Sequence, residues 1–91
     1  MTEKIRKRIT FFGSVQGVGF RYRASHVANA LRLTGWVHNE WDGTVSMEVQ
    51  GREEEIDKMI EMIQEGTYIS IEKIYVKQLP LDEHEGIFEI R

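Results

Sequence analysis

The chain has 91 residues, of which 41% are hydrophobic and 30% charged, and its net charge is −3. This composition is typical of one small globular domain, here residues 1–91, and it excludes a disordered chain. The sequence has no cysteine, which excludes disulfides and thiolate chemistry. The N-terminus lacks the apolar core of a signal peptide and no stretch reaches membrane-spanning length, so we expect a cytoplasmic protein without a membrane partner.

The charge is distributed unevenly along the chain. Residues 1–23 contain six Lys or Arg and one Glu, whereas residues 24–91 contain six Lys or Arg and 14 Asp or Glu. An anionic ligand is therefore expected to be drawn to the face built from the start of the chain. We interpret the basic run at residues 4–8 itself as an exposed strand end that is protected by charge. A sequence pI of about 5.6 argues against a nucleic-acid partner.

Periodicity in the first half of the chain predicts a strand, a helix and a hairpin. Apolar residues alternate over residues 5–11, which is typical of a half-buried strand. From about Phe20 they recur at helical spacing for about three turns. Two further alternating runs, residues 34–40 and 44–50, flank an Asp-Gly pair at 42–43, which is a strong hairpin signal.

The second half adds one helix and two strands. Residues 53–65 carry apolar side chains at helical spacing with acidic residues in the first turn. A strand follows from Ile69, and its alternation shifts near Lys73, which predicts a bulge or a late strand start. Pro80 ends this strand, and residues 87–90 form a short edge strand.

The expected order is βαββαβ with one extra C-terminal strand. This order predicts an α+β, ferredoxin-like split βαβ sandwich, in which an antiparallel sheet of four to five strands carries two helices on one face. The fold hosts many activities, so function has to be argued from particular residues.

The glycine-rich stretch from Gly13 to Arg21 joins the first strand to the first helix. Gly13, Gly17 and Gly19 can take positive φ angles that aim main-chain N–H groups into one concavity, and a helix start adds free donors and the positive end of its dipole. Arg21 opposes that dipole by about 0.3–1 kcal/mol, so we expect a bound anion to offset it. The alternative is that Arg21 is solvated or ion-paired and that the glycines serve only a tight connection. Neither the G-x-G-x-x-G nor the P-loop fingerprint is present, so the anion is not identified.

Asn39 is the second candidate, because asparagine is disfavoured in strands and this one lies late in a predicted strand. The alternative is that it simply ends the strand. No Ser/His/Asp arrangement and no metal-ligand spacing is present, so we predict no metal site, and His26, His38 and His84 are expected at the surface.

Three motifs together give the sequence a specific resemblance. The run Val-Gln-Gly-Val-Gly-Phe-Arg at 15–21, followed by Gly-Trp-Val-His-Asn at 35–39 and Asp-Gly-Thr-Val at 42–45, resembles the acylphosphatase family. The strong similarity covers residues 5–51. One departure is Arg32, which stands where the family commonly has glycine, and it bears on the end of the first helix.

The resemblance implies a ferredoxin-like enzyme that hydrolyses the carboxyl-phosphate bond of a small-molecule acyl phosphate to a carboxylate and inorganic phosphate. It assigns phosphate binding to Arg21 and the positioning of water to Asn39. The main-chain amides expected to bind the remaining phosphate oxygens are those of Val15, Gln16, Gly17, Val18, Gly19 and Phe20. No cofactor is implied, and we expect a monomer.

This chemistry agrees with the residues present. Charge in a phosphoryl-transfer transition state lies on the phosphate oxygens, so positioning and electrostatic stabilisation are the main requirements. The leaving carboxylate belongs to an acid with a pKa of about 4 and departs without a proton donor.

Two other hypotheses use the same fold. One is a non-catalytic module, with Arg21 as its anchor, that binds phosphate or another anion or serves as an interaction module. The other is an RNA-binding sheet, which we disfavour because Phe11, Trp36 and Trp41 are expected in the core, the sheet packing or a turn rather than as a stacking platform.

Overall fold

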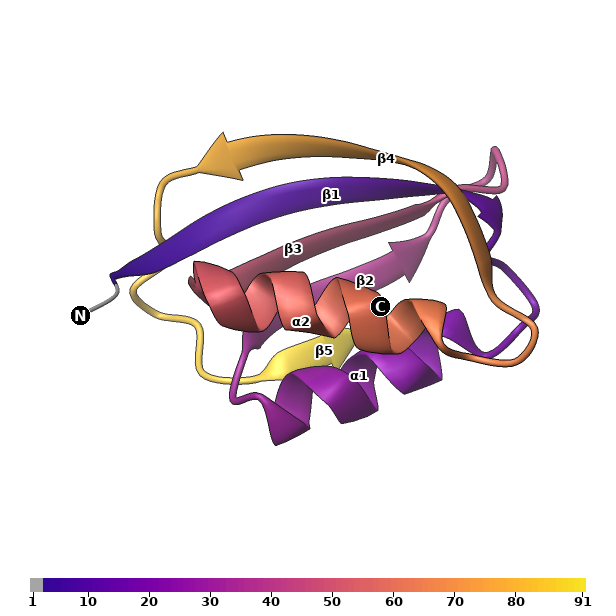
Figure 1. The fold of residues 1–91 in the computed structure, drawn as a ribbon. Helices are drawn as coiled ribbons and strands as arrows, with labels where there is room; N and C mark the ends of the chain where they lie inside the picture. The colour runs from indigo at the N-terminus through magenta and orange to yellow at the C-terminus, as the bar shows by residue number, and fades with distance from the viewer. Residues whose placement is uncertain (1–2) are drawn as a thin grey trace.

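The computed structural model describes residues 3–91, which form five strands and two helices (Figure 1). The elements in chain order are β1 (Lys4–Ser14), α1 (Phe20–Ala30), β2 (Thr34–Asn39), β3 (Val45–Arg52), α2 (Glu53–Gln64), β4 (Ser70–Leu79) and β5 (Phe88–Ile90). The βαββαβ order and the extra strand predicted from periodicity are confirmed. Within residues 3–91, neither helix combines the length and the apolar composition needed to cross a membrane.

The strands form one sheet in the order β4-β1-β3-β2-β5. The first four are antiparallel to their neighbours, but β5 pairs parallel to β2. The predicted antiparallel pairing therefore holds among β1, β2, β3 and β4 but not for β5 at the edge. The reason is topological: residues 80–87 carry the chain across the end of the sheet where β4 finishes, so β5 enters from the same end as β2.

Both helices lie on one face of the sheet and bury its apolar side chains (Figure 1). The side chains of β1, β2 and β3 alternate between this face and the uncovered one, as strand geometry requires. The largest fully buried side chains are Phe11, Phe20, Ile9, Met47, Ile56, Met59, Ile63, Val15, Val37, Val45 and Val49. The core therefore joins both helices to the three inner strands.

The β1–β4 pairing contains the irregularity that the sequence predicted near Lys73. Lys73 pairs with Phe12, and the register then shifts by one residue, which leaves Glu72 without a partner in β1. Gly13 lies at this shift with a φ of 126°, and a Cβ there would collide with the carbonyl oxygen of Ser70. Gly13 therefore serves the close approach of two strands, which corrects its assignment to an anion-binding loop.

The end of α1 explains how a non-glycine residue occupies a position that favours glycine. Arg32 has a left-handed φ of 59°. The N–H of Arg32 donates to the carbonyl of Asn29, and the N–H of Leu33 donates to the carbonyl of Ala28. These two bonds form a Schellman motif, which satisfies the last helical carbonyls even though arginine pays a steric penalty there.

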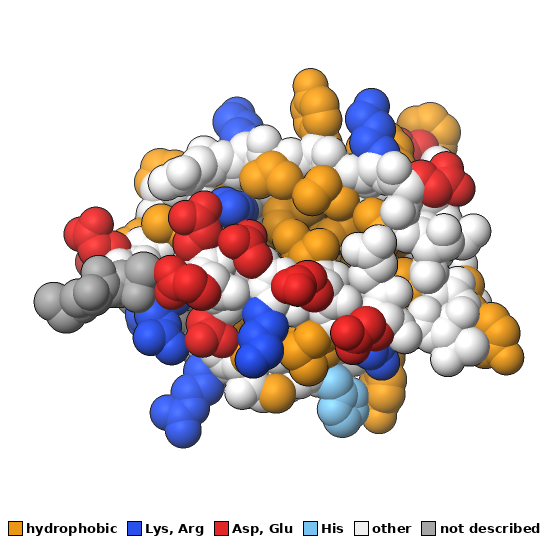
Figure 2. Space-filling model, viewed as in Figure 1, with side chains coloured by type: hydrophobic (Ala, Val, Ile, Leu, Met, Phe, Trp, Pro, Cys, Tyr) orange, Lys and Arg blue, Asp and Glu red, His pale blue; other side chains and the backbone are white. Residues whose placement is uncertain are grey.

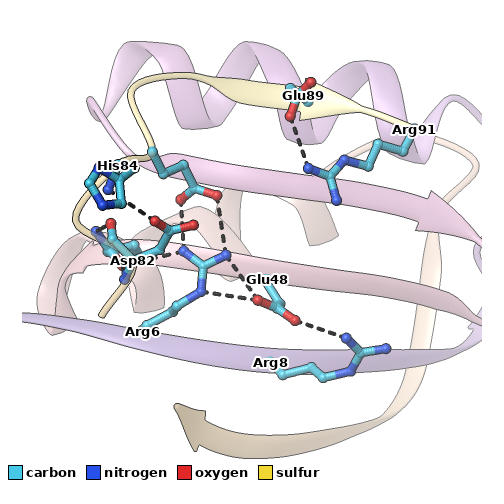
Figure 3. Close-up of polar contacts among 9 residues, drawn as sticks. Arg6, Arg8, Glu48, Asp82, His84, Glu89 and Arg91 are labelled. Atoms are coloured by element: carbon cyan, nitrogen blue, oxygen red, sulfur yellow. Dashed lines mark hydrogen bonds and ion pairs between the residues drawn. The ribbon is translucent and has the colours of Figure 1, made fainter. Parts of the chain in front are cut away.

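On the uncovered face of the sheet, Arg6 is 4% exposed and forms the centre of an ion-pair network (Figure 3). Its guanidinium donates to Glu48 and Glu85, and Glu48 also accepts from Arg8. The hydrogen bonds that Arg6 donates raise its pKa, the one to Glu85 most, while burial acts in the opposite direction and the bonds to Glu48 add to the rise. The interpretation of residues 4–8 as an exposed strand end is therefore wrong at Arg6, because the acidic partners come from β3 and from the distant segment before β5.

Candidate active site

The loop between β1 and α1 is held at both ends by buried side chains. Val15 is buried at its start, and the ring of Phe20 packs at 4.9 Å from the ring of Phe11 at its end. Between them, Gly17 and Gly19 have left-handed φ angles of 71° and 81°. This backbone path is open to glycine without a steric penalty, which is the reason for glycine at these two positions.

The N-terminus of α1 has no side-chain cap. Gly19 occupies the N-cap position, no acidic residue lies in the first turn, and Arg21 lies there instead. The first amides of the helix are therefore free of a capping side chain within the described chain. Free helix-start amides, the positive end of the dipole and a nearby guanidinium all favour an anion.

A cavity of about 180 Å³ lies over this helix start. It is lined by Val15, Gly17, Gly19, Phe20, Arg21, Tyr22 and Asn39. The loop, α1 and the end of β2 thus meet at one hollow, and it brings together Arg21 and Asn39, which are 18 residues apart in the sequence. No carboxylate or imidazole is among these lining residues.

The guanidinium of Arg21 is oriented by the main chain near the end of β5. Its Nη1 donates to the main-chain oxygen of Arg91 at 3.2 Å, and the N–H of Arg91 donates to the carbonyl of Val37 at 2.8 Å. Among residues 3–91, no Asp or Glu side chain lies within ion-pair distance of Arg21. Its other donors therefore remain available to a ligand.

Asn39 ends β2 at the cavity, and its side chain carries an unsatisfied acceptor. Its Oδ1 is the one buried side-chain nitrogen or oxygen in the described part of the chain that lacks a hydrogen-bond partner. A buried acceptor without a partner costs about 1–3 kcal/mol, which is the kind of cost that persists where the group has a role toward a ligand.

Gln16 connects the loop to the β2–β3 hairpin rather than lining the cavity. Its Nε2 donates to the carbonyl oxygens of Glu40, at 2.6 Å, and of Thr44, at 2.9 Å. Asp42 shapes the same turn by accepting from the N–H and the hydroxyl of Thr44. These hydrogen bonds, that of the hydroxyl first, lower the pKa of Asp42. The turn beside Asn39 is thereby fixed to the loop beside Arg21.

The structure gathers most of the predicted site residues but not all of them. Six of the eight line the cavity, whereas Gln16 bonds to the hairpin and Val18 packs against the core. Sequence reasoning missed Tyr22, whose position next to Arg21 in the first helical turn was the available signal. It also missed the main-chain oxygen of Arg91, for which the sequence carries no signal. No group of three or more His, Cys, Asp or Glu residues suited to a metal ion is found among residues 3–91.

Comparison with known proteins shows which family the chain resembles. The acylphosphatase family model matches residues 7–90. The acylphosphatase of Geobacillus thermodenitrificans is 40% identical over 86 residues, which cover 93% of this chain and 92% of the relative.

Solved structures agree with the sequence comparison. The crystal structure of acylphosphatase from Bacillus subtilis superposes with a TM-score of 0.87 at 33% identity, covering 96% of this chain and 98% of the other. A full-length HypF structure in a phosphate- and nucleotide-bound form gives a TM-score of 0.87 at 30% identity over 12% of its own chain. The chain therefore belongs to the acylphosphatase family.

Proposed function

We propose that this protein hydrolyses acyl phosphates, with the phosphoryl group bound over the start of α1. The observation that carries the proposal is the convergence of three groups on one cavity: the glycine loop with its free amides, Arg21, and the unsatisfied Oδ1 of Asn39. Family membership supports the reaction class. The roles of the individual residues are proposed as well.

Arg21 and the loop amides bind the phosphate oxygens in this mechanism. A guanidinium can donate two parallel charge-assisted hydrogen bonds, each worth about 1.5–3 kcal/mol. The bond from Nη1 to Arg91 fixes the orientation of the planar group before the substrate arrives, so less side-chain entropy is lost on binding. As charge builds on the phosphate oxygens in the transition state, these contacts strengthen.

Asn39 positions the attacking water. Its carboxamide, which lines the cavity, hydrogen-bonds the water and directs an oxygen lone pair at phosphorus. The new P–O bond forms as the P–O bond to the acyl group breaks, and the electron pair leaves with the carboxylate. Because no carboxylate or imidazole lines the cavity, an oxygen of the substrate's own phosphoryl group accepts the water proton.

Hydrolysis of acetyl phosphate and benzoyl phosphate in EDTA tests the proposal. The wild-type protein should release phosphate above the uncatalysed rate. Arg21→Ala should lose at least about 100-fold in kcat/KM, since it removes two charge-assisted bonds. Asn39→Ala should keep its inhibition constant for inorganic phosphate within about twofold while kcat falls by about 100-fold.

A matched control is Arg52→Ala, which removes an exposed arginine whose ion-pair partner among residues 3–91 is Glu55. Its activity should equal that of the wild type. Phosphate binding without turnover in the wild type would overturn the proposal in favour of a non-catalytic anion-binding module. The cytoplasmic location and the monomeric state expected from the sequence stay predictions.

A further inference from the structure

The cavity over α1 is small compared with the sites of about 300–1,000 Å³ that usually hold drug-sized molecules. This cavity has about 180 Å³, and its lining supplies the loop glycines, Arg21 and Asn39 for the phosphoryl group and its water. An acyl group much bulkier than acetyl therefore extends beyond it when the phosphoryl group is bound as proposed.

A second hollow adjoins the cavity through a shared side chain. It has a volume of about 420 Å³ and lies between α1 and α2, where it is lined by Tyr22, Arg23, His26, Val27 and Met62. Tyr22 lines both hollows. Because Tyr22 lies in the first turn of α1 and His26 one turn later, the second hollow continues along α1 from the helix start.

The walls of the second hollow are mainly apolar and aromatic. The Tyr22 side chain is 67% exposed, and its ring meets the ring of His26 edge-on at 4.6 Å. Figure 2 shows a histidine side chain beside exposed apolar side chains over α1. Val27 and Met62 complete an apolar floor. A methionine sulfur makes favourable contacts with aromatic rings, so this floor suits an aromatic ligand.

The floor is held in place by a bond between the two helices. The Nε of Arg23 donates to the main-chain carbonyl of Met62 at 2.7 Å, so α1 and α2 are fixed relative to each other at this point. Arg23 and the Met62 segment are therefore held in place before a ligand binds, which favours binding.

We propose that this hollow, lined by Tyr22, Arg23, His26, Val27 and Met62, is the acyl-group subsite and that it selects aromatic acyl groups. The proposal rests on the proposed hydrolase function. Asn39 belongs to β2 and Tyr22 to α1, so the water and the leaving carboxylate lie against different walls of the cavity. An aryl ring then packs against Tyr22 and His26, whereas an acetyl group is too short to reach them.

The test is the ratio of kcat/KM for benzoyl phosphate to that for acetyl phosphate. Tyr22→Ala should lower this ratio by about tenfold, the size expected for loss of an aromatic contact and its buried area. Tyr22→Phe should keep the ratio within about twofold, because the ring is retained. His26→Ala should lower it by about twofold to threefold, since the second ring is farther from the phosphate.

Tyr75→Ala is the matched control, because Tyr75 is 70% exposed on β4 and lines neither hollow. Its ratio should equal that of the wild type. An equal loss for both substrates in Tyr22→Ala would overturn the subsite, because a residue that supports only the phosphate site or the fold does not change the ratio.

A binding measurement separates failure of the subsite from failure of the hydrolase proposal. Benzoylphosphonate and acetylphosphonate carry an unhydrolysable C–P bond and can be titrated by calorimetry into the wild type and Tyr22→Ala. Preference for the benzoyl compound that Tyr22→Ala loses supports the subsite even if neither acyl phosphate is turned over. Equal affinities for the two compounds in the wild type would overturn it.

Discussion

The three glycines of the loop between β1 and α1 have different structural roles. The three loop glycines looked equivalent in the sequence, yet Gly17 and Gly19 line the cavity while Gly13 lies in the sheet against Ser70. Positive φ is common to all three, so the backbone angle alone did not distinguish them. Gly13 is distinguished by its contact with β4, a strand almost 60 residues away in the sequence.

Gln16 links the two sides of the candidate site. Its two bonds hold the hairpin that carries Asn39 against the loop that carries Arg21, although Gln16 does not line the cavity. Gln16→Ala should lower kcat by about tenfold because small displacements of a positioned water are costly. The inhibition constant for inorganic phosphate, measured in the same assay, should change by less than about twofold.

The control for this prediction is Gln78→Ala, an exposed glutamine on β4, which should leave both constants unchanged. A loss of phosphate affinity as large as the loss of kcat in Gln16→Ala would mean that Gln16 shapes the phosphate site itself. In that case the positioning role would be rejected.

Elements were predicted well because their signals are local. The apolar spacing of both helices and the alternation of the strands depend only on neighbours within a few residues, and the Asp-Gly pair gave the hairpin. The bulge near Lys73 was visible as a change of alternation for the same reason. What the local pattern missed was the length of β1, which continues to Ser14 because β4 pairs with its end.

The C-terminal end of α1 contains a residue with an unfavourable backbone conformation. Arg32 has a left-handed conformation, which costs an L-residue about 1–2 kcal/mol. Glycine avoids this penalty but lowers stability by about 0.4–1 kcal/mol, because it raises the conformational entropy of the unfolded chain. Arg32→Gly should therefore raise the free energy of unfolding by about 0.5–1 kcal/mol. The measurement is the midpoint of urea unfolding at constant slope.

Arg32→Ala separates conformation from charge. It removes the guanidinium but keeps the Cβ that causes the penalty, so its stability should stay near that of the wild type. If Arg32→Ala were stabilised as much as Arg32→Gly, the effect would come from the lost charge and the strain argument would be wrong.

At the scale of the whole molecule, the two faces of the sheet have different chemistry. One is buried under the helices, and α2 presents acidic side chains outward (Figure 2). The other carries the Arg6 network, which joins β1 and β3 to the segment that leads into β5 (Figure 3). Glu85 of the network lies before β5 and Arg91, whose main-chain oxygen accepts from Arg21, lies after it, so the two contacts flank the same short strand.

Removing the centre of this network should be costly. Arg6→Ala leaves the carboxylates of Glu48 and Glu85, which are only 18% and 12% exposed, without their shared cation. Breaking a buried ion pair from one side costs about 3–5 kcal/mol, so we expect a loss of about 3 kcal/mol in the free energy of unfolding, measured in urea. Lys7→Ala, which removes a pair whose carboxylate is 58% exposed, should cost less than about 1 kcal/mol. Similar losses in the two variants would contradict the structural role given to Arg6.

The sequence by itself determined the order of the elements, the loop at the start of α1, and Arg21 and Asn39 as candidates, because each depends on residue types within a short stretch. The tertiary structure decided what those residues face. Strand order β4-β1-β3-β2-β5 places Arg6 against Glu85, Arg21 against the main chain of Arg91, and the hairpin against Gln16. The parallel pairing of β5, the burial of Arg6 and the hollow beside Tyr22 all arise from segments far apart along the chain. Local patterns do not encode such encounters, because they form only when one core orders the whole sheet.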